Sequence, residues 1–138
     1  MSQRIPHLYV APSPLGGRGV FTAKRIPKGS IIEVCPVLVL PPGQLPHIDQ
    51  TELFNYYFEW AENSKSGALA LGYGSLYNHS YAPNAHYRAD MVMDTIDFYA
   101  LRAIPAGNEI FVNYNGTPKD DAPLWFEPTL VAKKKAKQ

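Results

Sequence analysis

The stretch Asn78-His79-Ser80-Tyr81-Ala82-Pro83-Asn84 follows an apolar segment, and Glu109-Ile110-Phe111-Val112-Asn113-Tyr114 comes later in the chain. Asn, Ser and Pro favour turns, because their side chains or rings set the local backbone geometry. On its own, the first stretch predicts a turn that contains a buried histidine. The second predicts a strand that ends in a tyrosine, whose ring normally packs in the core with its hydroxyl hydrogen-bonded. Only their order and spacing, taken with a third stretch, decide the fold.

The third stretch, Ser13-Pro14-Leu15-Gly16-Gly17-Arg18-Gly19-Val20-Phe21, lies near the N-terminus. Its three glycines permit backbone conformations and close approaches that a Cβ atom would block. It is not a dinucleotide-binding loop, because Val20 and Phe21 continue as a strand where that loop would open a helix. Taken alone, the stretch predicts a tight turn.

Turn residues and strand-forming residues alternate along the whole chain. Thirteen prolines and ten glycines separate short segments rich in Val, Ile, Tyr and Phe, which is typical of short strands. The predicted fold class is mainly β with one or two short helices. One helix is predicted at 49–62, because four apolar residues recur at the spacing of a single helical face. These four are Leu53, Tyr56, Tyr57 and Trp60. Strands are predicted at 8–11, 19–22, 31–40, 68–73, 85–88, 95–100 and 110–114.

The length of 138 residues suits one soluble domain, which we expect to occupy residues 1–132. Residues 133–138 form a lysine-rich tail that we expect to be disordered. No run of about 18 apolar residues occurs, and the N-terminus lacks the apolar stretch of a signal sequence. The expected location is the cytoplasm, or a nucleus, including a host nucleus if the chain is viral or is secreted into a host.

Cysteine, histidine and charge exclude several classes of function. Cys35 is the only cysteine and the four histidines are scattered, so neither a disulfide nor a metal site is expected. Outside the tail, 9 Lys and Arg stand against 12 Asp and Glu, a net charge of −3. This mildly acidic body argues against a nucleic-acid-binding β-barrel, which needs basic and aromatic residues on one face. It is compatible with a basic peptide as substrate.

Four motifs occur in a fixed order: Gly-x-Gly-Val-Phe, Ile-Pro-Lys-Gly, Asn-His-Ser-x-x-Pro-Asn, and Ala-x-x-x-Ile-x-x-Gly-x-Glu-Ile-x-x-x-Tyr. In this order they resemble the SET-domain protein-lysine N-methyltransferases, most closely the minimal single-domain members of large viruses and bacteria. The resemblance runs from about Leu8 to Gly116. It implies several small sheets with a C-terminal pseudoknot, in which the last strand passes through a loop formed by an earlier segment.

The resemblance also implies an activity and a set of site residues. The implied reaction is methyl transfer from S-adenosyl-L-methionine to the side-chain amine of lysine in a histone or another basic protein, and a homodimer is expected. The implied cofactor-binding residues are Gly17, Arg18, Gly19, Asn78 and His79, and the implied catalytic residue is Tyr114. The implied lysine channel contains Tyr56, Tyr73 and Tyr114, and no metal is expected.

The sequence departs from the family pattern at its C-terminal end. Many members have Asp-Tyr-Gly where this chain has Asn113-Tyr114-Asn115-Gly116, and the flanking zinc-binding cysteine clusters are absent. Trp125 and Phe126 either close the lysine channel in place of those clusters or cap the core. An alternative function is a SET-like module that binds lysine-rich peptides without catalysis.

Overall fold

The structure is a computed structural model that describes residues 4–60, 65–116 and 118–121. Within these residues strands dominate and the α-helix has only four residues, which confirms the predicted mainly β class. The strands are β1 (Leu8–Pro12), β2 (Arg18–Thr22), β3 (Ile31–Leu40), β4 (Tyr57–Trp60), β5 (Ser66–Ala70), β6 (Asn78–His79), β7 (Ala85–Asp90), β8 (Thr95–Ala100) and β9 (Phe111–Val112). The helical elements are η1 (Pro42–Gln44), α1 (Leu45–Ile48) and η2 (Glu52–Asn55).

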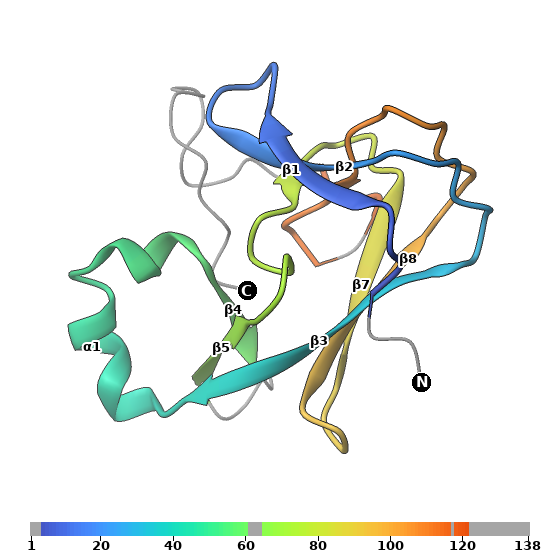
Figure 1. Cartoon of the computed structure of the whole chain (residues 1–138). Helices are drawn as coiled ribbons and strands as arrows, with labels where there is room; N and C mark the ends of the chain where they lie inside the picture. The colour runs from blue at the N-terminus through green and yellow to red at the C-terminus, as the bar shows by residue number, and fades with distance from the viewer. Residues whose placement is uncertain (1–3, 61–64, 117, 122–138) are drawn as a thin grey trace.

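The strands form three small sheets in the described part of the chain (Figure 1). β1 and β2 make an antiparallel pair, and five strands form a larger sheet in the order β4-β5-β3-β8-β7. β6 pairs in parallel with β9, which lies more than 30 residues further along the chain. This parallel pairing of distant segments is the one that the predicted C-terminal pseudoknot requires.

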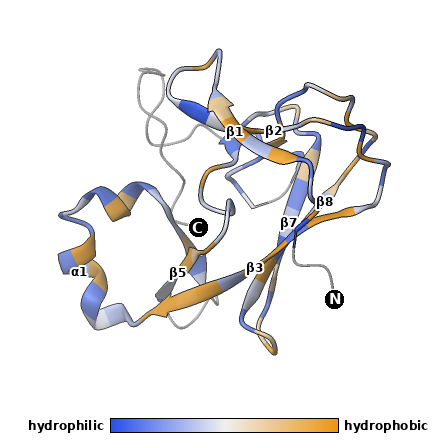
Figure 2. Ribbon diagram, in the orientation of Figure 1, coloured by the Kyte–Doolittle hydropathy of each residue, from blue (hydrophilic) through white to orange (hydrophobic). Residues whose placement is uncertain are grey.

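The core follows from the alternation of side chains along the central strands. On β8, Ile96, Phe98 and Ala100 are buried while the residues between them are partly exposed, as expected for a strand with one face in the core. Hydrophobic residues also lie along β3, which crosses the middle of the larger sheet (Figure 2). The core therefore sits on one face of this sheet, where it supports the short strands β6 and β9.

The helix predicted at 49–62 is wrong. Residues 45–55 form α1 and η2, and residues 57–60 form strand β4 instead. The four apolar residues at helical spacing are mostly aromatic, and aromatic side chains favour strands. β4 pairs with β5, where Gly67 leaves space for the Tyr57 ring, and the Tyr57 hydroxyl donates a hydrogen bond to Asp49 (2.8 Å). Strand pairing thus overrides the helical spacing.

Two predicted strands are shorter than expected or shifted, for local reasons. The strand predicted at 68–73 ends at Ala70, because Gly72 has a positive φ of 65° and the Tyr73 N–H donates to the Glu33 carboxylate (3.0 Å). The strand predicted at 110–114 is reduced to β9, because the Tyr114 N–H donates to the His79 side chain (3.0 Å).

The lysine-rich tail lies outside the described residues. The helical elements among the described residues are all too short to span a lipid bilayer.

Candidate active site

The glycine-rich stretch forms the turn between β1 and β2, as predicted. The Ser13 N–H donates to the Gly17 carbonyl (2.9 Å), and the Gly16 N–H donates to the Ser13 carbonyl (3.0 Å). Gly16 and Gly17 have φ values of 99° and 61°, which residues with a Cβ rarely adopt. Gly16, Gly17 and Arg18 are exposed, so the turn offers its backbone to a ligand.

Gly19 is needed for a different reason, namely close packing. A Cβ atom at Gly19 would collide with the Glu109 carboxylate and lie 2.6 Å from the Asn78 side-chain nitrogen. Both neighbouring side chains are buried. The glycine therefore lets the β1–β2 turn lie directly against the Asn-His strand β6.

Glu109 joins the three motifs that the sequence analysis singled out. Its carboxylate accepts hydrogen bonds from the Ser13 hydroxyl (2.8 Å) and from the Asn78 side-chain amide (2.5 Å). The same amide of Asn78 donates to the Arg18 carbonyl (3.1 Å). We call Glu109, Ser13 and Asn78 the Glu109 cluster. It connects the glycine-rich turn, β6 and the segment that leads into β9.

The second asparagine of the Asn-His motif fixes the chain just before β9. The Asn84 amide donates to the Glu109 carbonyl (2.9 Å), and its side-chain oxygen accepts from the Phe111 N–H (2.8 Å). Asn84 is buried, and these bonds satisfy both ends of its side-chain amide. The sequence analysis assigned no role to Asn84, Glu109 or Ser13. Their positions inside the motifs were the available signal.

His79 connects the predicted cofactor residues to Tyr114. Its Nδ1 accepts a hydrogen bond from the Tyr114 N–H (3.0 Å), so a neutral His79 carries its proton on Nε2. The His79 ring lies 5.2 Å from the Tyr114 ring and 4.3 Å from the Tyr81 ring, centroid to centroid. The predicted cofactor residues and the predicted catalytic tyrosine are therefore in one place.

The Tyr114 hydroxyl has a defined hydrogen-bond direction. Tyr114 is 4% exposed, and its hydroxyl donates to the Tyr77 carbonyl (2.7 Å). Burial raises the pKa of Tyr114 well above its usual range, and the nearby Tyr87, Glu109 and Tyr56 add to the effect. The hydroxyl is thus neutral, and it donates its proton to the Tyr77 carbonyl.

A second buried carboxylate supports the loop that holds Tyr77. Glu33 is 3% exposed and accepts hydrogen bonds from the Tyr77 hydroxyl (2.7 Å) and the Tyr73 N–H (3.0 Å). Arg4 lies 3.7 Å from the Glu33 carboxylate and stacks over the Tyr73 ring, 4.2 Å from its centroid. We call Glu33, Tyr73, Tyr77 and Arg4 the Glu33 cluster. Through Tyr77 it positions the carbonyl to which Tyr114 donates.

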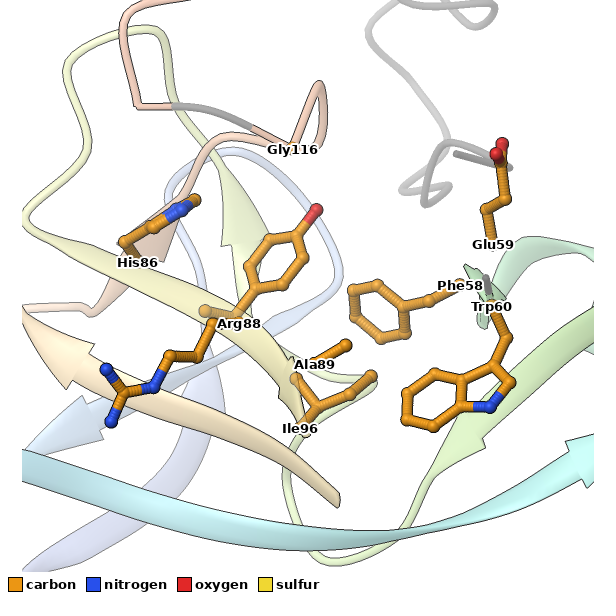
Figure 3. A pocket seen from close by; sticks show the side chains of 9 residues that line it. Phe58, Glu59, Trp60, His86, Arg88, Ala89, Ile96 and Gly116 are labelled. Atoms are coloured by element: carbon orange, nitrogen blue, oxygen red, sulfur yellow. The ribbon is translucent and has the colours of Figure 1, made fainter. Parts of the chain in front are cut away.

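A pocket of about 280 Å³ opens between β4 and β7, the two edge strands of the larger sheet. Figure 3 shows Phe58 and Trp60 on one side and His86 and Arg88 on the other, with Gly116 near the rim. The Phe58 ring meets the Tyr87 ring edge to face, with centroids 5.2 Å apart. The full lining is Phe58, Glu59, Trp60, His86, Tyr87, Arg88, Ala89, Ile96 and Gly116.

Comparison with known proteins identifies the family that has this arrangement. The sequence profile of the SET domain matches residues 17–115, which include the glycine-rich turn, the Asn-His strand and Tyr114. The chain belongs to the SET-domain family. The predicted family and its enzyme class, protein-lysine N-methyltransferase, are therefore confirmed.

Individual relatives agree with this assignment. The chain is 36% identical to an H3 lysine-37-specific histone-lysine N-methyltransferase of Schizosaccharomyces pombe, over 112 residues that cover 80% of this chain and 71% of the relative. A structure from Plasmodium falciparum, named as a candidate histone methyltransferase, matches with a TM-score of 0.64 and 33% identity. That match covers 80% of this chain and 98% of the other. A humanised mutant of Polycomb Repressive Complex 2 from Chaetomium thermophilum shares the fold at a TM-score of 0.71 and 20% identity, over 85% of this chain and 16% of the other.

The SET domain brings together most, but not all, of the predicted site residues. Gly19, Asn78, His79 and Tyr114 form a continuous set of contacts. Tyr56 lies close enough to affect the pKa of Tyr114. The Tyr73 ring packs against Arg4 instead, so its place in the lysine channel stays a prediction and its contacts favour a structural role.

The structure also accounts for the asparagine found where many SET domains have aspartate. The buried Asn113 amide donates to the Asp120 carbonyl (2.5 Å), and its oxygen accepts from the Asn115 N–H (2.9 Å). An aspartate is unable to make the first bond, since an ionised carboxylate has no donor.

Trp125 and Phe126 lie outside the described residues. Within the described part of this SET domain, no group of three or more His, Cys, Asp or Glu is placed to hold a metal ion.

Proposed function

We propose that the chain transfers a methyl group from S-adenosyl-L-methionine to the side-chain amine of lysine in a protein substrate. The observation that carries this proposal is the Tyr114 hydroxyl. The hydroxyl donates to the Tyr77 carbonyl, and the Tyr114 N–H donates to His79. His79 follows Asn78, whose side-chain amide donates to the Arg18 carbonyl of the glycine-rich turn. A neutral phenol whose proton points to a fixed carbonyl, beside a cofactor site, is suited to orient an amine through its oxygen.

The residues present fit the cofactor. The turn at Gly17 and Arg18 is exposed and lies against Asn78, because Gly19 has no Cβ to separate them. The buried Glu109 carboxylate and the His79 and Tyr114 rings favour a cationic sulfonium. When bound, the cofactor supplies a methyl group that an amine accepts in an in-line displacement. Gly17, Arg18, Gly19, Asn78 and His79 would hold it.

The protein's own contribution is desolvation and positioning. A free lysine amine has a pKa near 10.4 and is almost fully protonated at neutral pH. Phe58, Trp60 and Tyr87 give the pocket aromatic walls, and desolvation of a lysine side chain against such walls favours the neutral amine. The Tyr114 oxygen accepts an N–H of that amine and so fixes the direction of its lone pair. Because its pKa is raised, Tyr114 acts as a neutral phenol and not as a base.

The first candidate substrate is histone H3. The relative from S. pombe is named for lysine 37 of H3, and a body charge of −3 suits a basic partner. A histone substrate would place the enzyme in a nucleus, and other basic proteins are reachable in the cytoplasm.

The homodimer stays a prediction. Light scattering at tens of micromolar protein tests it.

The test is a radiolabelled methyl-transfer assay on core histones with the full chain. We expect label on a lysine of H3, located by mass spectrometry, and we expect the same rate after exhaustive chelation of metals. Peptide binding without transferred label would instead support the alternative of a non-catalytic binding module. Activity that is lost on chelation and restored by zinc would contradict the metal-free expectation.

A further inference from the structure

Positive and negative charges are segregated along this chain. Residues 4–32 contain five Lys and Arg residues and no Asp or Glu, whereas residues 45–60 contain three Asp and Glu residues and no Lys or Arg. The net charge of −3 outside the tail, which argued against nucleic acid as a partner, averages over these two regions. The five basic residues are Arg4, Arg18, Lys24, Arg25 and Lys28. The proposed function gives no role to the last three.

Lys24, Arg25 and Lys28 lie close together in the segment that joins β2 to β3, and we call them the basic loop. All three side chains are exposed. None of them forms an ion pair with an acidic side chain of the described residues. Their charges are therefore available to an anionic partner.

The backbone of the basic loop is fixed by hydrogen bonds. Ile26, in the middle of the loop, is 2% exposed, and it exchanges two backbone hydrogen bonds with Ile104 (2.8 Å each). The Thr22 hydroxyl donates to the Lys24 carbonyl (2.6 Å), and the Gly29 N–H donates to the Ala100 carbonyl (2.9 Å). A partner that binds here has to order only side chains, which keeps the entropic cost of binding small.

The segment that packs against the basic loop adds positive charge and no negative charge. Residues 100–108 contain the exposed Arg102 and no Asp or Glu. The next acidic residue, Glu109, is 6% exposed, and its carboxylate accepts from Ser13 and Asn78. The basic loop and Arg102 therefore belong to a surface without an exposed carboxylate on either of the two segments.

The acidic residues lie at the other end of β3. This strand has ten residues and runs from the basic loop to η1 and α1 (Figure 1), so it separates the two regions by roughly 30 Å. Asp49 directly follows α1, and Glu59 lines the pocket between β4 and β7. The side with the pocket is thus suited to a basic peptide, and the opposite side to a polyanion.

We propose that the basic loop binds the phosphate backbone of duplex DNA. The proposal goes beyond the proposed function, because methyl transfer does not require this surface. Residues 23–30 contain no aromatic side chain on which unpaired bases could stack, which favours a duplex over a single strand. A nucleosome presents basic histone segments and DNA phosphates together, and so it matches both sides of the molecule. Contacts to phosphates alone do not depend on base sequence.

The experiment measures binding of the full chain to a labelled duplex of about 20 base pairs by fluorescence anisotropy at several salt concentrations. The variant that combines Lys24→Gln and Lys28→Gln is compared with wild type and with the combination of Lys65→Gln and Lys119→Gln. Lys65 and Lys119 are exposed lysines outside the basic loop, so this pair is the matched control. The lysine-rich tail is present in every protein and contributes equally to all of them.

We expect the basic-loop variant to bind the duplex at least about tenfold more weakly at 0.1 M salt. The slope of log affinity against log salt concentration should fall by about two, because each lost phosphate contact lowers it by about one. The control pair should bind as wild type does. Replacing Lys24 and Lys28 with arginine keeps both charges and should preserve binding.

Each outcome decides the proposal. Equal losses in the two glutamine pairs, or an unchanged salt slope in the basic-loop variant, overturn it. Tighter binding of a poly-glutamate peptide than of the duplex would assign the basic loop to an acidic protein, and tighter binding of single-stranded RNA would assign it to RNA. Both results overturn the proposal. If the basic-loop variant folds poorly, Arg25→Gln alone should lower the salt slope by about one, and an unchanged slope overturns the proposal. None of these results affects methylation of free histones, which tests the proposed function separately.

Discussion

The Glu109 cluster and the Glu33 cluster each surround a buried carboxylate, but they connect different parts of the chain. Among the described residues, Glu109 accepts hydrogen bonds from two neutral donors, the Ser13 hydroxyl and the Asn78 amide, and it joins segments up to 96 residues apart. Glu33 accepts from the Tyr77 hydroxyl and from the Tyr73 backbone N–H, and the exposed Arg4 lies beside it. The first cluster holds the glycine-rich turn against β6. The second sets the carbonyl that directs the Tyr114 hydroxyl.

The two clusters meet at Tyr114, through different atoms. Its N–H bonds to His79, the neighbour of Asn78, and its hydroxyl bonds to the Tyr77 carbonyl. The two clusters therefore have separate functions. The Glu109 cluster supports the glycine-rich turn, and the Glu33 cluster directs the Tyr114 hydroxyl. Damage to the Glu109 cluster should weaken cofactor binding, and damage to the Glu33 cluster should slow turnover at saturating cofactor.

The largest effect is expected for Gly19→Ala, which disrupts the Glu109 cluster. The added Cβ collides with the buried Glu109 and Asn78 side chains, so these must shift and their hydrogen bonds are disturbed. We expect a loss of about 1–3 kcal/mol in the free energy of unfolding. Calorimetry should show cofactor affinity falling by roughly 100-fold, which corresponds to about 2.7 kcal/mol. Gly43→Ala is the control, because a Cβ there meets nothing within 4 Å. Normal cofactor binding by Gly19→Ala would contradict the assignment of the turn.

The next largest effect is expected for Tyr114→Phe, at the point where the clusters meet. The ring is kept, so cofactor affinity should change little. The buried Tyr77 carbonyl loses its donor, which costs about 1–3 kcal/mol of folding stability. Turnover should fall at least tenfold, or about 1.4 kcal/mol in the barrier. Tyr9→Phe, at an exposed position on β1, controls for loss of a hydroxyl elsewhere. Wild-type turnover by folded Tyr114→Phe would show that another residue orients the amine.

Ser13→Ala and Tyr77→Phe form a matched pair that tests the comparison directly. Each removes one hydroxyl donor, the first from Glu109 and the second from Glu33. Bonds to charged groups contribute about 1.5–3 kcal/mol, so both variants should be less stable. We expect Ser13→Ala to weaken cofactor binding and Tyr77→Phe to lower kcat, each by roughly three- to tenfold. Identical kinetic profiles for the two variants would show that the clusters act as one unit.

The sequence was sufficient to predict the motifs but not the contacts between them. The glycine-rich turn was predicted correctly from a local pattern. Asn78 and His79 were predicted to lie in a turn, but they form strand β6 because they pair with the distant β9. Glu109 and Asn84 were missed, because their roles depend on pairing between β6 and β9, which no local pattern reveals. The alternation of β7 places Ala85, Tyr87 and Ala89 on one face. It does not reveal that the Tyr87 hydroxyl has no hydrogen-bond partner within the part of the chain that the structure describes.

The helix predicted at 49–62 failed for a similar reason. Its apolar spacing fitted a helix, but Tyr57, Phe58 and Trp60 pair with β5 and line the core and the pocket. Spacing alone does not distinguish a helical face from an aromatic strand that has a partner elsewhere. The partner, β5, begins at Ser66, after the residues that were assigned to the helix.

The smallest effect is expected for His86→Gln, at the pocket and away from both clusters. Burial lowers the pKa of His86 from its usual value of 6.5, and its Nδ1 has no hydrogen-bond partner among the described residues. Below pH 6.5 the unfolded chain takes up a proton that the folded chain resists, so stability falls as the pH falls through this range. Glutamine does not titrate. The loss of melting temperature between pH 7.5 and pH 5.5 should therefore be smaller in His86→Gln than in wild type. His47→Gln on exposed α1 should retain the wild-type loss. An equal loss in all three proteins would mean that His86 is protonated as readily in the folded chain as in the unfolded one.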